Sequence, residues 1–468
     1  MRKTTLALSL VVMLNGCALI HSETKPTLAS PEAWRNASDA TSEANTALAR
    51  DFWLAYDDAA LNRLMDQALR ASPDVRIAAA NVENYRARVT ATSADRFPQL
   101  GIGAQAARGK GGDFPPTPVN SFSLGVNASW EVDLWGRLAR STDAARADLL
   151  AQREVQRGVY LSLAASVAQS YFTLRQLDTQ LEIAQRTLTL RKESLDLFQL
   201  RFDGGVISEV ELAQVRSEYE QAFAAVPQAQ AAIARTENAL SVLLGRNPGP
   251  IERGKQLEQL RDPEVPAGLP SELLTRRPDI RAAEAQLAAA DARVDAARLA
   301  WFPRISLTGL FGVASGDLSA LFNDGSQVWN GVAGLTQPVF DAGRIGAGVD
   351  SARATREAVV AQYQKTVQNA FREVDDALVS RVKLREELAA LTRQVASLTR
   401  YAELARLRYE NGYTSYLEVI DADRALFSAD LNRVSVQAAL FGASVDLYRA
   451  LGGAWMDSRI EGAKSAAG

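Results

Sequence analysis

The sequence contains a single cysteine and a single histidine among its 468 residues. One cysteine excludes a disulfide framework, and one residue of each type excludes a Cys/His metal cluster. With one histidine, the sequence contains no credibly placed Ser-His-Asp triad. It also shows no paired acid and base arranged as in a catalytic pocket. We therefore expect a protein that is not an enzyme and that holds no cofactor or metal.

Excess charge of either sign is also absent. The 52 lysine and arginine residues nearly balance the 55 aspartate and glutamate residues, which gives a formal net charge of -3, and the basic residues are scattered along the chain. A nucleic-acid-binding surface requires a basic cluster, so we expect no nucleic acid among the partners. With 47% hydrophobic and 23% charged residues, the chain can bury a core and is not disordered.

Beyond residue 16 the sequence has no run of about 18 apolar residues, the length that a membrane-spanning helix needs. The first 16 residues combine a basic start with a short apolar run, and this pattern predicts a secretory signal peptide. Cys17 follows Leu14–Gly16 in the arrangement at which bacterial lipoprotein precursors are acylated and cleaved. We expect Cys17 to carry a lipid anchor; the alternative is an unmodified Cys17 beside an ordinary cleavage site.

The chain contains two copies of one unit of roughly 200 residues. Residues 201–212 and 408–419 share an arginine, an aromatic residue, an acid, a glycine turn, a serine and a glutamate at matching places. Their offset of 207 residues recurs between Gly136-Arg137 and Gly343-Arg344. At an offset of 205, residues 72–76 match 277–281, and Phe97-Pro98 matches Phe302-Pro303.

Within each copy the hydrophobic pattern changes in a fixed order. Proline at a first-turn position and Ala-, Arg- and Glu-rich sequence predict helices over 73–96 and 278–300. Apolar residues spaced three and four apart predict long coiled-coil-like helices over about 139–202 and 346–410, followed by returning helices over about 208–246 and 416–451. Strict alternation between them predicts a β-hairpin in each copy. The expected apolar face of these strands comprises Leu100, Ile102, Ala104, Ala106, Phe122, Leu124, Val126, Ala128, Trp130, Val132, Ile305, Leu307, Gly309, Phe311, Val313, Trp329, Gly331, Ala333 and Leu335.

The expected fold is therefore mixed α and β, with four strands per chain. Its segments are a lipoprotein signal peptide (1–16), a lipid-anchored N-terminal segment with a first short helix (17–71), repeat 1 (72–246) with its hairpin (97–135), a linker and equatorial segment (247–276), repeat 2 (277–453) with its hairpin (302–341), and a C-terminal tail (454–468). Four strands cannot span a membrane alone, because open sheet edges leave backbone groups unsatisfied in hydrocarbon. Bacterial outer-membrane barrels have about eight strands or more, so two or more copies must share one barrel.

Several motifs occur in a fixed order: the lipobox, the Pro-Asp helix starts, the Phe-Pro strand entries, 133–137, 340–344, 371–378 and the Gly412 turn. Over essentially the whole mature chain, the sequence resembles the outer membrane factor (TolC-like) family, the exit ducts of tripartite efflux pumps. It is most similar to the lipid-anchored drug-efflux branch, the NodT-type outer membrane efflux lipoproteins. The resemblance implies a homotrimer in which a 12-stranded outer-membrane β-barrel continues into a 12-helix periplasmic α-barrel.

Two turns join the long helices to the returning helices, and the resemblance implies that these tips dock a periplasmic adaptor protein. The candidate docking residues are Gly205, Val206 and Ser208 in the first turn and Gly412, Tyr413 and Ser415 in the second. Both turns also have a plain structural role, in which glycine ends one helix and serine caps the next.

An acidic pair follows the second turn. Glu418 and Asp421 are three residues apart, so they share a face of the returning helix. The resemblance implies that they form an acidic ring that constricts the closed pore; Glu211 holds the equivalent place in repeat 1, where Gln214 departs from the pattern. Three copies of each carboxylate around one axis would repel anions and bind cations. The alternative is a solvated helix face without a gate.

The expected function is that of the outer-membrane channel of a tripartite efflux system. The channel would passively conduct drugs or other toxic organic compounds from an inner-membrane pump and a periplasmic adaptor to the exterior. Alternatives are an exit duct for secreted protein or polysaccharide, a heavy-metal efflux duct, and a static envelope-spanning spacer, for which alternating strands would be superfluous. The low count of 4 methionines and 1 histidine favours organic substrates over metal ions. Outer-membrane lipid is a further expected partner, through acylated Cys17.

Overall fold

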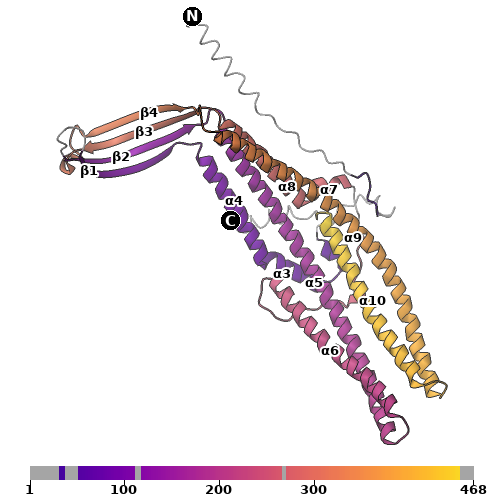
Figure 1. Ribbon diagram of the computed structural model, residues 1–468. Helices are drawn as coiled ribbons and strands as arrows, with labels where there is room; N and C mark the ends of the chain where they lie inside the picture. The colour runs from indigo at the N-terminus through magenta and orange to yellow at the C-terminus, as the bar shows by residue number, and fades with distance from the viewer. Residues whose placement is uncertain (1–30, 37–50, 111–117, 266–269, 454–468) are drawn as a thin grey trace. The chain divides into compact units, whose positions relative to one another are not determined.

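The computed structural model describes residues 31–36, 51–110, 118–265 and 270–453. The expected signal peptide, Cys17 and the C-terminal tail lie outside these residues. The described helices and strands are η2 (Phe52–Tyr56), α3 (Ala59–Ala71), α4 (Pro73–Ala94), β1 (Gln99–Lys110), β2 (Pro118–Val132), α5 (Arg137–Asp203), α6 (Glu209–Leu243), η3 (Leu257–Gln259), α7 (Pro270–Arg276), α8 (Pro278–Leu299), β3 (Arg304–Ser315), η4 (Leu318–Ala320), β4 (Gln327–Thr336), α9 (Arg344–Glu410) and α10 (Tyr416–Ala450) (Figure 1).

The two copies of the unit have matching elements. Helices α4 and α8 are each 22 residues long, α5 and α9 are each 67 residues long, and α6 and α10 are each 35 residues long. Each copy also contributes one antiparallel hairpin, β1–β2 or β3–β4. The helices and hairpins predicted from the hydrophobic pattern are therefore confirmed, with ends that differ from the expected ones by a few residues.

The chain divides into two compact units, and each unit takes its segments from both repeats. Unit 1 contains Ala80–Glu154 and Ala282–Lys365, and so holds the whole sheet. Unit 2 contains the described parts of Ala29–Ala79, Val155–Arg281 and Thr366–Gly468. Among the described helices, none includes an apolar stretch long enough to cross a lipid bilayer.

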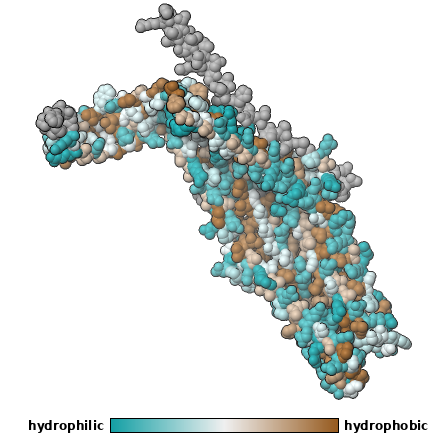
Figure 2. Space-filling view, in the orientation of Figure 1, coloured by the Kyte–Doolittle hydropathy of each residue, from teal (hydrophilic) through white to brown (hydrophobic). Residues whose placement is uncertain are grey.

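The sheet of unit 1 is antiparallel, in the order β1-β2-β3-β4. Its register places Ile102, Val126, Phe311 and Trp329 directly opposite one another across all four strands. All four side chains are exposed, Ile102 at 80% and Trp329 at 81%. The predicted apolar face is therefore confirmed, and apolar patches are visible on the surface of the sheet in Figure 2. Within the chain, the outer edges of β1 and β4 pair with no other described strand.

Aspartates cap the two long helices where they leave the sheet. Asp133 accepts hydrogen bonds from the backbone N–H groups of Leu138 (3.0 Å) and Ala139 (2.7 Å) at the start of α5. Asp341 accepts from the backbone N–H of Gly343 (3.0 Å) and from the backbone N–H of the second residue of α9. Carboxylates at a helix N-terminus satisfy otherwise unpaired N–H groups. The repeated Asp/Gly-Arg motif of the sequence is therefore a strand-to-helix cap.

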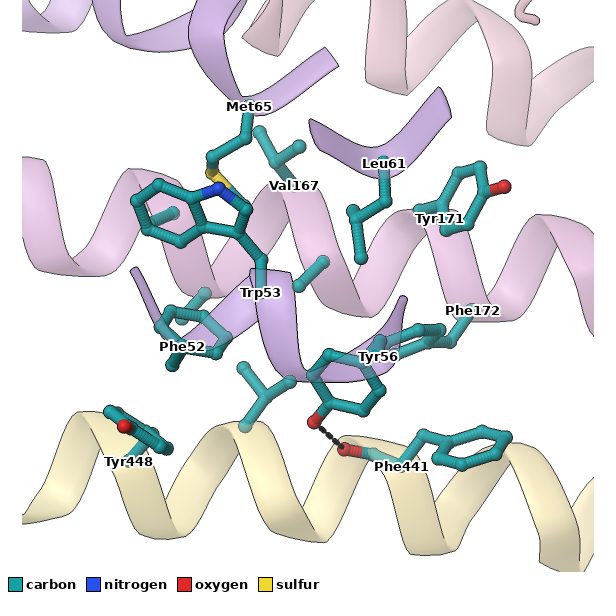
Figure 3. Close-up of a cluster of buried hydrophobic side chains, with 14 of the residues drawn as sticks. Phe52, Trp53, Tyr56, Leu61, Met65, Val167, Tyr171, Phe172, Phe441 and Tyr448 are labelled. Atoms are coloured by element: carbon teal, nitrogen blue, oxygen red, sulfur yellow. Dashed lines mark hydrogen bonds between the residues drawn. The ribbon is translucent and has the colours of Figure 1, made fainter. Parts of the chain in front are cut away.

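The core of unit 2 contains aromatic side chains that η2 inserts between α5 and α10 (Figure 3). Phe52 stacks on Tyr448 with ring centroids 4.8 Å apart, and Tyr56 packs 4.7 Å from Phe172. Nearby, the fully buried Asp58 carboxylate caps α3 and accepts a 2.7 Å hydrogen bond from the Tyr171 hydroxyl. This cluster fixes the N-terminal segment on the helices that carry the tips.

Candidate functional site

The two tips of unit 2 are turns of the same geometry. Gly205 and Gly412 end α5 and α9 with φ angles of 71° and 75°, in the left-handed region that favours glycine. In the first turn the Gly205 N–H donates to the Phe202 carbonyl oxygen (2.8 Å). The next N–H, that of Val206, donates to the carbonyl oxygen five residues earlier in the chain. Gly412 and Tyr413 repeat both bonds. This Schellman arrangement confirms that glycine ends each long helix.

The two returning helices begin differently, although their N-cap residues are both serine. Ser208 forms a capping box with Glu211: the Ser208 Oγ accepts from Glu211 N–H (3.3 Å), and Glu211 Oε2 accepts from Ser208 N–H (2.9 Å). The Ser415 side chain makes no capping hydrogen bond. The expectation that serine caps both helices is therefore wrong for Ser415, and the reciprocal half of a capping box is missing too, because Arg408 and Thr414 hold the Glu418 carboxylate.

This difference predicts unequal effects of two matched substitutions. Ser208→Ala should destabilise the start of α6 by about 1 kcal/mol, so that its first amides exchange hydrogen about fivefold faster. Ser415→Ala should leave the start of α10 nearly unchanged, because no side-chain cap is lost. Hydrogen–deuterium exchange of the two variants, read in peptides from each helix start, measures both effects. Equal acceleration in both variants would contradict the assignment.

The acidic residues that follow the tips lie in three different environments. Glu418 is half-buried; its Oε1 accepts from Arg408 Nη1 on α9 (2.6 Å), and its Oε2 accepts from the Thr414 hydroxyl. Asp421 lies one turn further along α10 and is exposed. Glu211 is also exposed, and its carboxylate is engaged in the capping box. The structure thus gives Glu418 a cationic partner on the neighbouring helix.

The two hairpins, α5–α6 and α9–α10, contact each other just behind their turns. The Phe198 ring of α5 lies 4.3 Å from Tyr416 of α10, and Tyr416 lies 5.0 Å from Tyr409 of α9. Arg201 Nη1 donates to the Tyr409 hydroxyl (2.5 Å). Arg201 is the repeat 1 counterpart of Arg408, so the same repeated arginine bonds across the hairpins in one tip and within its own hairpin in the other.

Each tip exposes three apolar side chains at equivalent positions of the repeat. The members are Leu200, Val206 and Val210 in the first tip and Leu407, Tyr413 and Leu417 in the second, and each pair is offset by 207 residues. Val206 is 75% exposed and Tyr413 is 78% exposed. Large apolar side chains that project together into solvent mark an interaction surface. We call these two sets the tip triads.

A cluster of charged residues lies further along the hairpins, in the part of unit 2 between the tips and the aromatic core. Buried Arg191 of α5 forms an ion pair with buried Glu218 of α6 (3.1 Å), and Arg424 of α10 bonds the other Glu218 oxygen. Asp423 pairs with Arg406 of α9 (3.2 Å). Burial raises the pKa of Asp423 and lowers the pKa of Arg191. These groups join all four helices of the two hairpins.

Sequence reasoning found the turns and the acidic pair but missed their partners. Arg201 and Arg408 had a signal, since both stand in the repeated tip motif beside an aromatic residue. No sequence signal marked the cluster around Glu218. An arginine or glutamate on a long charged helix is indistinguishable from a solvated residue until the covered face of that helix is known. Cys17, the expected lipid site, lies outside the described residues.

The fold and the tips together define a class of protein. The sequence matches the outer membrane efflux protein family over residues 64–246 and 269–453, and the two matched segments correspond to the two repeats. The chain belongs to this family. It is an outer-membrane component of an efflux system, in a family of channels rather than of enzymes.

Individual relatives are similar over nearly the whole chain. The solvent efflux pump outer membrane protein SrpC of Pseudomonas putida is 38% identical, covering 98% of this chain and 100% of that protein. The cation efflux system protein CusC of Escherichia coli O6:H1 is 36% identical, covering 94% and 96%. The crystal structure of the open state of the Neisseria gonorrhoeae MtrE outer membrane channel superposes with a TM-score of 0.84 at 32% identity, covering 93% of this chain and 98% of that one.

Proposed function

We propose that three copies of the chain form a passive channel that carries small organic compounds across the outer membrane. A periplasmic adaptor and an inner-membrane pump supply the compounds and the energy, and the channel itself performs no chemistry. The observation that carries this proposal is the sheet of unit 1, which exposes an apolar row across four strands and whose outer edges pair with no other described strand.

Both features of the sheet support a shared barrel. An apolar sheet face suits contact with lipid, and free strand edges in a membrane must pair with strands from other copies. Four strands from each of three chains give twelve, and pairing β1 of one copy with β4 of the next would close the ring without an edge. We expect the six helical hairpins of the trimer to form the periplasmic tunnel.

The tip triads support docking of the adaptor. They present the same arrangement twice per chain, so a trimer would offer six related surfaces. Val206 and Tyr413 carry the apolar contacts in this proposal, Gly205 and Gly412 set the turn, and Ser208 and Ser415 complete the accessible rim. An apolar patch of this kind suits a partner that presents apolar side chains of its own.

Glu418 and Asp421 are the proposed gate. In a closed trimer, three copies of each acid would ring the axis, with Arg408 holding each Glu418 in place. Glu211 adds a third acidic position, in which the capping box orients the carboxylate. The Arg408–Glu418 pair lies within one hairpin, α9–α10, so it fixes the position of the carboxylate, whereas opening separates that hairpin from α5–α6. We further propose that acylated Cys17 tethers the chain to the outer membrane.

The substrates are proposed to be organic compounds, in keeping with relatives named for solvent and toluene efflux. A cation duct is the second candidate, since relatives named as cation efflux proteins are nearly as similar. The scarcity of methionine and histidine, 4 and 1 in the whole chain, supports the organic class.

An accumulation assay in cells tests the proposal. Deleting the gene should raise the intracellular level of ethidium, a fluorescent organic cation, and restoring the chain should lower it again. Copper tolerance and the amount of secreted protein and polysaccharide should not change in the same pair of strains. A deletion that alters copper tolerance or secretion, with ethidium unaffected, would replace the organic efflux assignment with one of the alternatives.

A further inference from the structure

The internal duplication extends to the pairing of the strands. Strand β3 is the repeat 2 counterpart of β1, at an offset of 205 residues, and β4 is the counterpart of β2, at an offset of 207. Within the chain β2 pairs with β3, over Phe122–Val132 and Ile305–Ser315, and we call this pairing the inner seam (Figure 1). The outer seam is the pairing of β4 with β1 of the next copy. It joins the counterparts of the same two strands.

The registers of the two hairpins obey these offsets residue by residue. Gln99 lies opposite Ser129 in the first hairpin. Moving Gln99 by 205 residues and Ser129 by 207 gives Arg304 and Thr336, and these two residues lie opposite each other in the second hairpin. The offsets read from the sequence motifs therefore hold in the sheet itself.

Two side-chain hydrogen bonds at the helix end of the sheet obey the same offsets. Trp130 Nε1 donates to the backbone carbonyl oxygen of Arg96 (2.9 Å). Gln337 Nε2 donates to the backbone carbonyl oxygen of Trp301 (2.8 Å). The second donor lies 207 residues after the first donor, and the second acceptor lies 205 residues after the first acceptor. Because the hairpins are equivalent in structure, the register of the inner seam can be transferred to the outer one.

The transfer gives one register. In the inner seam Ala128 lies opposite Gly309. Leu335 stands 207 residues after Ala128, and Ala104 stands 205 residues before Gly309. We propose that β4 of one copy pairs with β1 of the next copy with Leu335 directly opposite Ala104, an inference that rests on the trimer proposed above.

This register keeps the apolar face continuous across the outer seam. Leu335 and Ala104 both belong to the apolar face of the sheet, so the paired strands turn their apolar side chains to the same side. A shift of one residue would place the apolar side chains of β4 beside the polar face of β1. A shift of two residues would preserve the faces but would make the outer seam differ from the inner one.

The register also provides a partner for exposed apolar side chains at the helix end of both outer strands. Val339, three residues beyond β4, is 94% exposed, and Leu100 of β1 is 74% exposed. Continuing the register past the end of β4 places Val339 opposite Leu100 of the next copy. Their inner-seam counterparts, Val132 and Ile305, lie opposite each other and are half-buried.

Oxidative cross-linking of cysteine pairs in the full-length protein, in outer-membrane preparations, tests this register. A Cβ atom at Gly309 would lie 4.0 Å from the Ala128 Cβ, a separation that a disulfide spans. Ala128→Cys/Gly309→Cys should therefore form a disulfide within each chain, and it serves as the reference. Leu335→Cys/Ala104→Cys should join three chains into a covalent trimer on a non-reducing gel, at a comparable rate. Leu335→Cys alone should give no covalent trimer.

Two shifted pairs are the controls. Leu335→Cys/Ile102→Cys and Leu335→Cys/Ala106→Cys move one partner by two residues, about 6.6 Å along β1, and should cross-link at least tenfold more slowly. Faster cross-linking of a shifted pair would overturn the register and leave the trimer in place. A trimer that none of the three pairs cross-links, with the reference disulfide formed, would overturn the pairing of β4 with β1. A protein that elutes as a single chain would overturn the proposed trimer itself.

Discussion

Cells that produce the Glu418→Ala/Asp421→Ala variant should become sensitive to vancomycin, an antibiotic too large for ordinary porins. In each chain the substitution removes a partly exposed ion pair with Arg408, worth about 0.5 kcal/mol. The variant also removes two carboxylates from each of three chains, so the proposed ring loses the charge and the side-chain bulk that narrow it, and the inhibitory concentration should fall several-fold. Removing the ring of charge also lowers the barrier to anions. The minimal inhibitory concentration of vancomycin measures the leak.

Two further variants separate the possible causes of such a leak. Arg408→Gln breaks the same ion pair but keeps both acids, so it should sensitise the cells less than the double variant if the acids themselves close the pore. Glu403→Ala is the matched control, because Glu403 forms a surface ion pair with Arg400 (3.0 Å) on the same helix, away from the gate. Sensitivity in the Glu403 variant equal to that of the double variant would show a general loss of packing and contradict the gate.

Val206→Asp combined with Tyr413→Asp should abolish efflux while the trimer still reaches the outer membrane. Each substitution places a carboxylate at the centre of a proposed apolar contact, and burying an unpaired charge there costs several kcal/mol. Val206 is 75% exposed and Tyr413 is 78% exposed in the chain, so folding should tolerate the change. Ethidium accumulation should rise to the level of the deletion strain.

Val242→Asp is the control for the tip variant. Val242 is 61% exposed and lies at the far end of α6 from the turn, so its substitution adds the same charge away from the docking surface. Efflux should remain close to normal in this variant. If the tip variant also retained normal efflux, with the same amount of trimer in the outer membrane, the tip triads would not be the docking surface.

The repeat and the alternating strands made much of the fold predictable. An offset of 207 residues between equivalent motifs requires equivalent elements, and the paired helices have equal lengths. The apolar face was predictable because side chains on a strand alternate strictly between its two faces. Assigning one residue of a strand to a face therefore assigns every other residue of that strand. Phe311 opposite Val126 in the observed sheet follows from that rule.

The fine structure of the candidate site was less predictable. Ser208 and Ser415 occupy equivalent positions, yet only Ser208 caps its helix with its side chain, and the Glu418 carboxylate bonds Arg408 and Thr414 instead of closing a capping box. That choice depends on a neighbouring helix rather than on local sequence. The pairing of Arg191 with Glu218 likewise depends on which helix faces are covered, and the weak periodicity of long charged helices leaves that undecided.

Recording single channels of the detergent-extracted protein in planar bilayers tests the central claim most directly. The account predicts a trimer with a small, cation-selective conductance, which increases sharply in the Glu418→Ala/Asp421→Ala variant. Large steady pores that are identical in the parent protein and the variant would contradict the gate assignment and leave the channel assignment in place. A folded, trimeric protein that never conducts in either form would contradict the channel itself and leave a structural spacer.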